Sequence, residues 1–141
     1  MGRSDYQRMF EPILYGWREG SPHFWCGARD QGDLWLIDKP QVNDLHPTMK
    51  PVELVERAVV NSSKRGESVL DAFGGSGTTL IACEKKGRKA RVIELDPHFC
   101  DVIVQRWQDF TGQTGILESE ERSFSEVAEE RLSEAPEEVE P

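Results

Sequence analysis

The segment 69–79, VLDAFGGSGTT, constrains the fold more than any other part of this 141-residue chain. Its apolar residues around one aspartate predict a buried strand over residues 68–73. Three glycines follow within four positions, and residues 78–86 then have a helical pattern with Gly87 as the expected C-cap. Because glycine has no Cβ, such a turn can be tight and its N–H groups can approach a ligand closely. A strand that ends in glycines and opens a helix is therefore typical of an anion or nucleotide site.

A second unit of strand and helix follows directly in the sequence. Residues 89–95 have the pattern of a strand, and Asp96–Pro97 is a favourable start for a helix that continues to Phe110. Upstream, Pro51 suits the first turn of a helix that ends near Asn61. Two consecutive β-α units predict a parallel sheet and an α/β fold. In such sheets ligands bind beyond the carboxyl ends of the strands, which is where the glycines lie.

Residues 10–38 are rich in aromatic residues and contain other strand formers. The stretches FEPILYGW, HFWCG and DLWLID are separated by turn residues, so we expect short strands in this region. A loop with three prolines, KPQVNDLHPTMKP, then leads to the first helix. The tryptophans of the chain are expected in the core rather than in a platform that stacks on nucleic-acid bases.

The glycine spacing and one acidic residue narrow the choice of ligand. GGSG is not followed by Gly-Lys-Ser/Thr and does not match G-x-G-x-x-G, which argues against ATP, GTP and NAD. Glu94 lies seventeen residues after Gly77, at the end of the second predicted strand. An acidic side chain there is well placed to accept hydrogen bonds from both ribose hydroxyls of a nucleoside. Either Glu94 or Asp96 could instead cap the next helix; we expect Asp96 to cap it and Glu94 to face the ligand.

These residues together resemble a known family. DAFGGSGTT, followed by IELDP and preceded by HPTMKPVELVERAV, is similar to the amino-group DNA methyltransferases of the permuted β-type. Those enzymes modify adenine N6 or cytosine N4 with S-adenosylmethionine (SAM), and many belong to restriction-modification systems. The resemblance, which extends over roughly residues 6–112, implies a Rossmann-like SAM-dependent methyltransferase fold that is present here only as its C-terminal, cofactor-binding half. It implies F-x-G-x-G at Phe73, Gly75 and Gly77, and a ribose ligand at Glu94.

The resemblance also implies a set of cofactor-binding residues. The H-P-T-x-K-P segment, which lines the methionine end of the cofactor in the family, matches residues 46–51. The candidate cofactor-binding residues are His46, Thr48, Lys50, Asp71, Phe73, Gly75, Ser76, Gly77, Thr78 and Glu94. Alternatives stay open for some of them: Lys50 could be solvated beside a helix start, Asp71 could pin the loop by a hydrogen bond, and Thr78 could cap a helix. We further expect a leucine at Gly77 to occupy the ligand's space while the chain stays folded.

A second motif of the family is missing from this chain. The family activates the exocyclic amine of the base with a polar residue followed by Pro-Pro and an aromatic residue. No two of the eight prolines here are adjacent, and Asp96–Pro97 lacks the second proline. The base-activating residues and DNA contacts would then come from a missing half or a partner chain. The chain could be a fragment, a subunit of a split enzyme, or a non-catalytic SAM-binding or interaction module.

Charge divides the chain in two. Residues 118–141 carry ten acidic and two basic residues, whereas residues 1–117 are nearly neutral. We therefore expect residues 1–117 to form the methylase portion and residues 118–141 to form an acidic, disordered tail. The three cysteines and three histidines show no metal-binding spacing, so no metal is expected, and a cytoplasmic protein is predicted. A half-sheet with open apolar faces also predicts self-association or a partner subunit.

Overall fold

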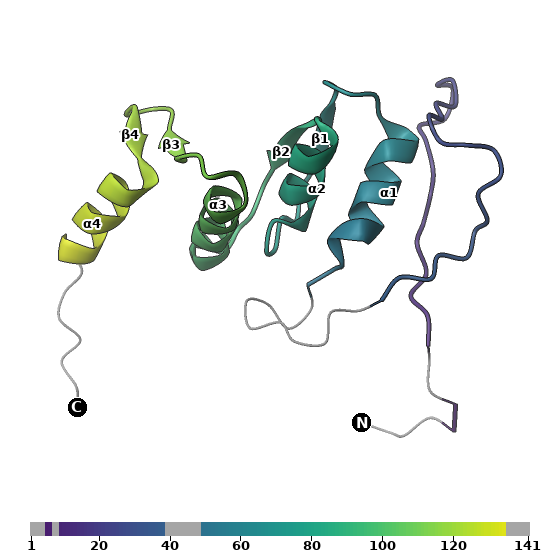
Figure 1. Cartoon of the computed structure of the whole chain (residues 1–141), viewed down its shortest axis with the longest axis horizontal. Helices are drawn as coiled ribbons and strands as arrows, with labels where there is room; N and C mark the ends of the chain where they lie inside the picture. The colour runs from purple at the N-terminus through teal and green to yellow at the C-terminus, as the bar shows by residue number, and fades with distance from the viewer. Residues whose placement is uncertain (1–4, 7–8, 39–48, 135–141) are drawn as a thin grey trace.

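The structure, a computed structural model, describes residues 5–6, 9–38 and 49–134. Its elements follow in the order α1 (Val52–Ser62), β1 (Ser68–Asp71), α2 (Thr78–Lys86), β2 (Lys89–Val92), α3 (Pro97–Thr111), β3 (Ile116–Leu117), β4 (Arg122–Ser123) and α4 (Phe124–Glu134). Figure 1 shows α1, the two longer strands with α2, and α3 side by side, with the short β3–β4 hairpin and α4 at one end. His46 and Thr48 of the candidate site lie outside the described residues.

The two longer strands form a parallel sheet, as predicted. β1 and β2 pair in register from Ser68 opposite Lys89 to Asp71 opposite Val92. Along each strand exposed and half-buried residues alternate, so one face is covered and the other is open. The prediction that residues 68–73 form a buried strand was therefore wrong in two respects. The strand ends at Asp71, and with one neighbouring strand and helices on a single face, it is only half covered.

The helices begin and end where local sequence signals place them. Pro51 lies at the N-cap of α1, Gly87 caps the C-terminus of α2 in the left-handed conformation, and the Asp96 carboxylate accepts a hydrogen bond from His98 N at the start of α3. α2 contacts α1, α3 and β2, and the buried apolar residues of the core come from the three helices. These core residues are Val59, Ile81, Ala82, Cys83 and Ile103.

An ion-pair cluster joins α1 to α2. The Glu56 carboxylate, whose side chain is only 12% exposed, pairs with Lys85 and, at 2.8 Å, with Lys86. Burial opposes ionisation of this carboxylate, but hydrogen bonds from the two lysines outweigh it, so the pKa of Glu56 is held below its usual range. The cluster therefore contributes to the packing of the two helices only while Glu56 is ionised.

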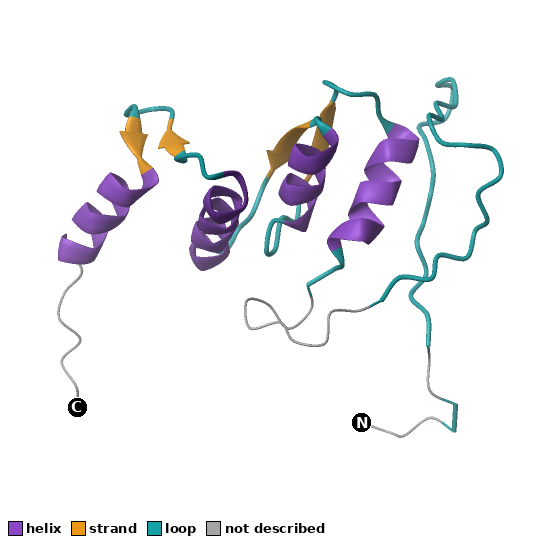
Figure 2. Ribbon diagram, viewed as in Figure 1, coloured by secondary structure: helices purple, strands orange, loops and turns teal. Residues whose placement is uncertain are grey.

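The strands predicted in residues 10–38 do not form. Of residues 9–38, the structure assigns none to a strand, and Figure 2 shows this segment as an extended loop beside α1. The segment is held by polar contacts instead: Cys26 N donates to the Asn61 carbonyl at 2.7 Å, and the side-chain amides of Gln31 and Asn61 exchange two hydrogen bonds. Aromatic and β-branched residues favour extended backbone, but a strand also needs a neighbouring strand with which to pair.

Residues 116–134 contain regular elements in the structure, whereas the expectation of an acidic, disordered tail over residues 118–141 stays a prediction. β3 and β4 form an antiparallel hairpin, and α4 follows it. Ser123 and Glu126 form a reciprocal capping box: Ser123 N donates to the Glu126 carboxylate at 2.7 Å, and Glu126 N donates to Ser123 Oγ at 3.2 Å. The S-x-x-E spacing is visible in the sequence, but the prediction for this segment followed its acidic composition. The division of the chain at residue 118 stays a prediction.

Within the described part of the chain, no helix is long and apolar enough to cross a membrane. The same residues contain no group of three or more His, Cys, Asp or Glu side chains that could hold a metal ion. Cys26 is exposed, Cys83 is buried and Cys100 is half-buried, and all three are free thiols.

Candidate functional site

A loop of six residues, 72–77, joins the carboxyl end of β1 to the start of α2. Two of its glycines, Gly75 (φ 53°) and Gly77 (φ 79°), adopt the left-handed conformation that side chains disfavour. Gly77 is the N-cap of α2 and supplies no side-chain acceptor to the first N–H groups of the helix. Its own N–H donates to the Gly74 carbonyl at 2.9 Å, which closes the turn. The loop therefore places the positive end of the α2 dipole at the edge of the sheet.

The three glycines are needed for different reasons. A Cβ at Gly74 would lie 2.4 Å from Val92 Cγ1, and a Cβ at Gly77 would lie 3.2 Å from two side-chain carbons of Ile103. A Cβ at Gly75 would meet nothing within 4 Å. A Cβ at Gly77 would press on Ile103 of α3, and the expected entry of a leucine side chain into the ligand's space stays a prediction. Gly75 is the glycine whose open side leaves room for a ligand to approach the backbone.

Asp71, the last residue of β1, ties the loop to α2. Its Oδ1 accepts a hydrogen bond from Phe73 N at 3.0 Å, and its Oδ2 accepts one from Thr79 Oγ1 at 2.6 Å. This is the loop-pinning role that the sequence left open for Asp71. A contact between Asp71 and a cofactor amine stays a prediction, and it remains compatible with these bonds because each carboxylate oxygen has two lone pairs.

Glu94, two residues beyond the end of β2, reaches across to the glycine loop. Gly75 N donates to Glu94 Oε2 at 2.6 Å. The other oxygen, Oε1, accepts from Leu95 N at 2.8 Å and Asp96 N at 3.0 Å. Asp96 itself caps α3, as predicted, whereas the expected contact of Glu94 with a ligand stays a prediction. The structure thus brings together a carboxylate and the open glycine from two separate β-α units.

Lys50 and Thr78 connect the segment before α1 to the start of α2. Thr78 Oγ1 donates to the Lys50 carbonyl at 3.4 Å, while the Lys50 ammonium forms an ion pair with Glu11. The side chain of Lys50 is 54% exposed. Its predicted position beside a cofactor carboxylate therefore stays untested, and in this structure its partner is a carboxylate of the protein.

Two residues of α3 that complete the loop were not among the predicted site residues. Ile103 packs under Gly74 and Gly77, and the Arg106 guanidinium donates from Nη1 to the Ser76 carbonyl at 2.9 Å. Burial lowers the pKa of Arg106 from its usual range. The two residues are three positions apart on α3 and therefore share a face. The helical pattern showed that face, but nothing in one sequence indicated that it would meet the glycine loop.

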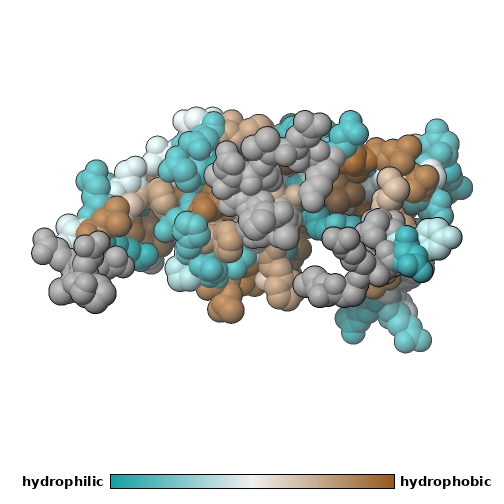
Figure 3. All heavy atoms as spheres, turned by 90° about the horizontal axis from the view of Figure 1, so that it is seen from below, coloured by the Kyte–Doolittle hydropathy of each residue, from teal (hydrophilic) through white to brown (hydrophobic). Residues whose placement is uncertain are grey.

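Large apolar side chains lie exposed around this end of the sheet. Phe73 is 90% exposed and Leu95 is 95% exposed, and Leu70 on the open face of β1 is 70% exposed. Hydrophobic residues are visible among hydrophilic ones on the face of the molecule seen from below in Figure 3. Exposed apolar residues that gather around a site are typical of a surface that something else covers.

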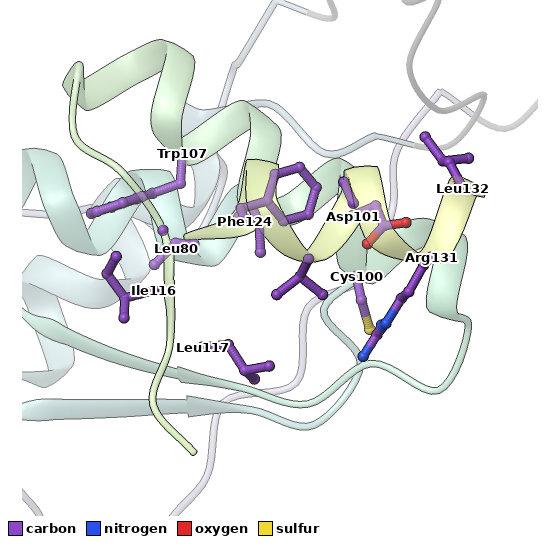
Figure 4. Close-up of a pocket in the computed structure, with 13 residues that line it drawn as sticks. Leu80, Cys100, Asp101, Trp107, Ile116, Leu117, Phe124, Arg131 and Leu132 are labelled. Atoms are coloured by element: carbon purple, nitrogen blue, oxygen red, sulfur yellow. The ribbon is translucent and has the colours of Figure 1, made fainter. Parts of the chain in front are cut away.

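A separate hollow of about 440 Å³ lies between α3 and the C-terminal hairpin with α4. Figure 4 shows Trp107, Ile116 and Phe124 among the side chains that line it. Of the described residues, neither the loop residues 72–77 nor Glu94 line this hollow. The glycine loop is therefore a different site, open to solvent at the edge of the sheet rather than enclosed.

The family to which the chain belongs follows from its residues 21–105. They match the family model described as DNA methylase, over more than half of the chain. The chain belongs to the DNA methylase family. The matched region includes the glycine loop, Glu94 and Ile103, so the assembled site is part of what the family model matches, whereas Arg106 lies one residue beyond it.

Known methylases resemble this DNA methylase chain over part of their length. Type II methyltransferase M.Cfr9I of Citrobacter freundii is 34% identical over 82 residues, which are 58% of this chain and 27% of the relative. Type II methyltransferase M.XycI of Xanthomonas campestris pv. cyanopsidis is 30% identical over 99 residues, which are 70% of this chain and 33% of the relative. The chain thus spans about a third, or less, of the curated relatives that it matches.

A solved structure agrees with this assignment. The crystal structure of the M1.HpyAVI–SAM complex matches with a TM-score of 0.50 and 28% identity, covering 59% of this chain and 44% of that one. The resemblance to amino-group DNA methyltransferases is confirmed, and so is the prediction of a Rossmann-like methyltransferase fold that is present in part. The permuted β-type order of the motifs stays a prediction.

Proposed function

We propose that this chain binds S-adenosylmethionine as the cofactor-binding part of a DNA amino-methyltransferase that acts on adenine N6 or cytosine N4. One observation carries the proposal: the Glu94 carboxylate meets Gly75 N at 2.6 Å, beside the one loop glycine whose open side has space for a ligand. Membership of the DNA methylase family supports it, as does the SAM bound to the similar M1.HpyAVI structure.

The residues present fit this cofactor. Gly75 leaves the backbone accessible, Glu94 offers a carboxylate for ribose hydroxyls, and Ser76 and Thr78 offer hydroxyls at the positive end of α2. With Lys50, Asp71, Phe73 and Gly77, and with His46 and Thr48 outside the described residues, these are the residues that we propose hold SAM. When bound, the cofactor supplies an activated methyl group on its sulfonium. This chain's own task is to orient the cofactor, since holding two reactants in place is a large part of such catalysis.

The proposal assigns base activation to residues outside this chain. None of the eight prolines has a proline neighbour, so the Pro-Pro-aromatic motif that acts on the flipped base is absent from these 141 residues. DNA would be bound together with a partner chain or further protein that carries this motif. DNA as substrate and three free thiols both favour the cytoplasm as the location.

A non-catalytic module that binds SAM or another protein is the second candidate. The exposure of Leu70, Phe73 and Leu95 favours it, because large apolar side chains left exposed are suited to contact with a protein partner. Self-association through these side chains is the simplest form of such a contact. Methyl transfer to DNA on addition of a partner, and not by the chain alone, would favour the split-enzyme proposal over this candidate.

Substitution of Glu94 tests the proposed cofactor binding. Glu94→Gln should weaken binding of S-adenosylhomocysteine about tenfold or more, the range expected for losing hydrogen bonds to a charged group. Glu67→Gln is the matched control, because that exposed carboxylate also accepts a backbone N–H, from Lys64, but at the other end of β1. Equal affinity of the Glu94 variant and the unmodified chain would remove Glu94 from the site. Methyl transfer to DNA by the chain alone would contradict the claim that base activation comes from elsewhere.

A further inference from the structure

Arg106 makes all of its described hydrogen bonds to the glycine loop and the start of α2. Its Nη1 lies 2.9 Å from the Ser76 carbonyl oxygen, 3.3 Å from Ser76 Oγ and 3.4 Å from Thr78 Oγ1. The guanidinium comes from α3, in the second β-α unit, so it links that helix to the loop of the first unit. Neither the packing of the core nor the proposed cofactor contacts so far require a cation at this position.

Arg106 has no ion-pair partner among the residues that the structure describes. Among the described residues, no carboxylate oxygen lies within 4.0 Å of its guanidinium nitrogens. The side chain is half-buried, and burial is the cause of its lowered pKa. A half-buried cation with only neutral acceptors favours a nearby anion, because desolvation strengthens such an attraction. The N-terminus of the nine-residue helix α2 adds partial positive charge at the same place.

The hydrogen-bond roles of the two hydroxyls follow from the chemistry of arginine. A guanidinium only donates, so Ser76 Oγ and Thr78 Oγ1 must accept from it. Thr78 then donates its single hydroxyl proton to the Lys50 carbonyl. Ser76, which is 5% exposed, donates its hydroxyl proton to no acceptor among the described residues. A buried donor without an acceptor is unfavourable, so an acceptor on a ligand at Ser76 Oγ would be stabilising.

We propose that Arg106 is a positioning residue: by holding the carbonyl and hydroxyl oxygens of Ser76, it directs the Ser76 hydroxyl proton to the carboxylate at the amino-acid end of the cofactor. The inference rests on the proposed function, since it needs SAM as the ligand. The carboxylate is the only anionic group of SAM. Within the described part of the chain, the Ser76 hydroxyl proton has no acceptor and Arg106 has no carboxylate partner, and both favour an anion here together with the N-terminus of α2. Arg106 acts through Ser76 and stabilises the bound carboxylate without contacting the reacting methyl group.

A pair of nucleosides separates this role from a merely structural one. S-adenosylhomocysteine has the carboxylate, whereas 5′-methylthioadenosine lacks the whole amino-acid end. Arg106→Gln and Ser76→Ala should each weaken the binding of S-adenosylhomocysteine about tenfold, which corresponds to the loss of one charge-assisted hydrogen bond. Neither substitution should change the affinity for 5′-methylthioadenosine. The double variant should be no weaker than the single variants, because both act on one contact. Arg106→Lys, which keeps the charge and a donor, should retain more affinity than Arg106→Gln.

Arg88 provides the matched control. It also donates to a serine, at 2.6 Å to the Ser63 carbonyl and 3.2 Å to Ser63 Oγ, but at the opposite end of α2. Arg88→Gln should lower the melting temperature as Arg106→Gln does, and should leave the affinities of both nucleosides unchanged. Equal losses for the two nucleosides in the Arg106 variants, or additive losses in the double variant, would overturn the positioning role. If the unmodified chain binds neither nucleoside, the proposed function itself is wrong, and this inference with it.

Discussion

Alanine substitutions at the glycine loop should separate glycines that serve packing from the glycine that serves ligand access. At Gly77 an alanine adopts the left-handed conformation, which is unfavourable by about 1–2 kcal/mol for a residue with a Cβ. Its Cβ would also lie 3.2 Å from Cγ1 and Cγ2 of Ile103, and overpacking of this kind destabilises by about 1–3 kcal/mol. Gly77→Ala should therefore lower the free energy of unfolding by about 2–5 kcal/mol.

Gly75→Ala is the matched control for backbone strain. Gly75 has the same left-handed conformation, but a Cβ there would meet nothing within 4 Å. The substitution should lower the free energy of unfolding by about 1–2 kcal/mol only. Its Cβ would lie on the open side of the loop, so its main effect should fall on the affinity for S-adenosylhomocysteine.

Urea unfolding followed by circular dichroism measures the two free energies, and calorimetry on the folded variants measures the affinities. Ile103→Ala removes the two side-chain carbons that a Cβ at Gly77 would meet. Its cost in free energy of unfolding should therefore be smaller in the Gly77→Ala background than in the unmodified chain. Equal stability of the Gly75 and Gly77 variants, or no coupling between Gly77 and Ile103, would refute the distinction drawn between the glycines.

Three further predictions concern other parts of the chain. Glu56→Gln should lower the free energy of unfolding at pH 7, because Lys85 and Lys86 hold the pKa of the Glu56 carboxyl below its usual range in the folded state. The difference in free energy between variant and unmodified protein should disappear as the pH falls below about 4.5 and through that lowered pKa. A constant difference down to about pH 2 in urea unfolding would contradict this. Ser123→Ala should destabilise α4 by about 1 kcal/mol through loss of its capping box, seen as faster amide hydrogen exchange there and no change in α2. A thiol reagent should label Cys26 rapidly in the folded protein and leave Cys83 unlabelled, because Cys83 is buried and burial raises the pKa of its thiol. Labelling of both thiols at one rate would show that the core opens.

Local signals predicted the central units closely. The sequence predicted a helix over 78–86 capped by Gly87, and a helix start at Asp96–Pro97; both are present. These signals are local because a glycine cap or an aspartate N-cap acts within one turn of backbone. The capping box at Ser123 is equally local, but the prediction for that segment followed its acidic composition and did not use this signal.

The failures concern contacts between distant parts of the chain. The aromatic residues in 10–38 favour extended backbone, but a strand requires an edge to pair with, which no pattern in that segment reveals. Ile103 and Arg106 were visible only as positions on a helix, because their contacts with Gly77 and Ser76 depend on how α3 crosses the loop. Sequence reasoning found the loop and Glu94, whereas the packing beneath the loop had to come from the structure.

The central claim is that this chain alone forms a binding site for the cofactor. Titration of the purified, folded chain with S-adenosylmethionine in a calorimeter tests it most directly. We predict saturable binding at one site per chain, because Glu94 and Gly75 already lie together in the structure at 2.6 Å. A chain that is folded by circular dichroism and gives no heat of binding at millimolar cofactor would contradict the claim.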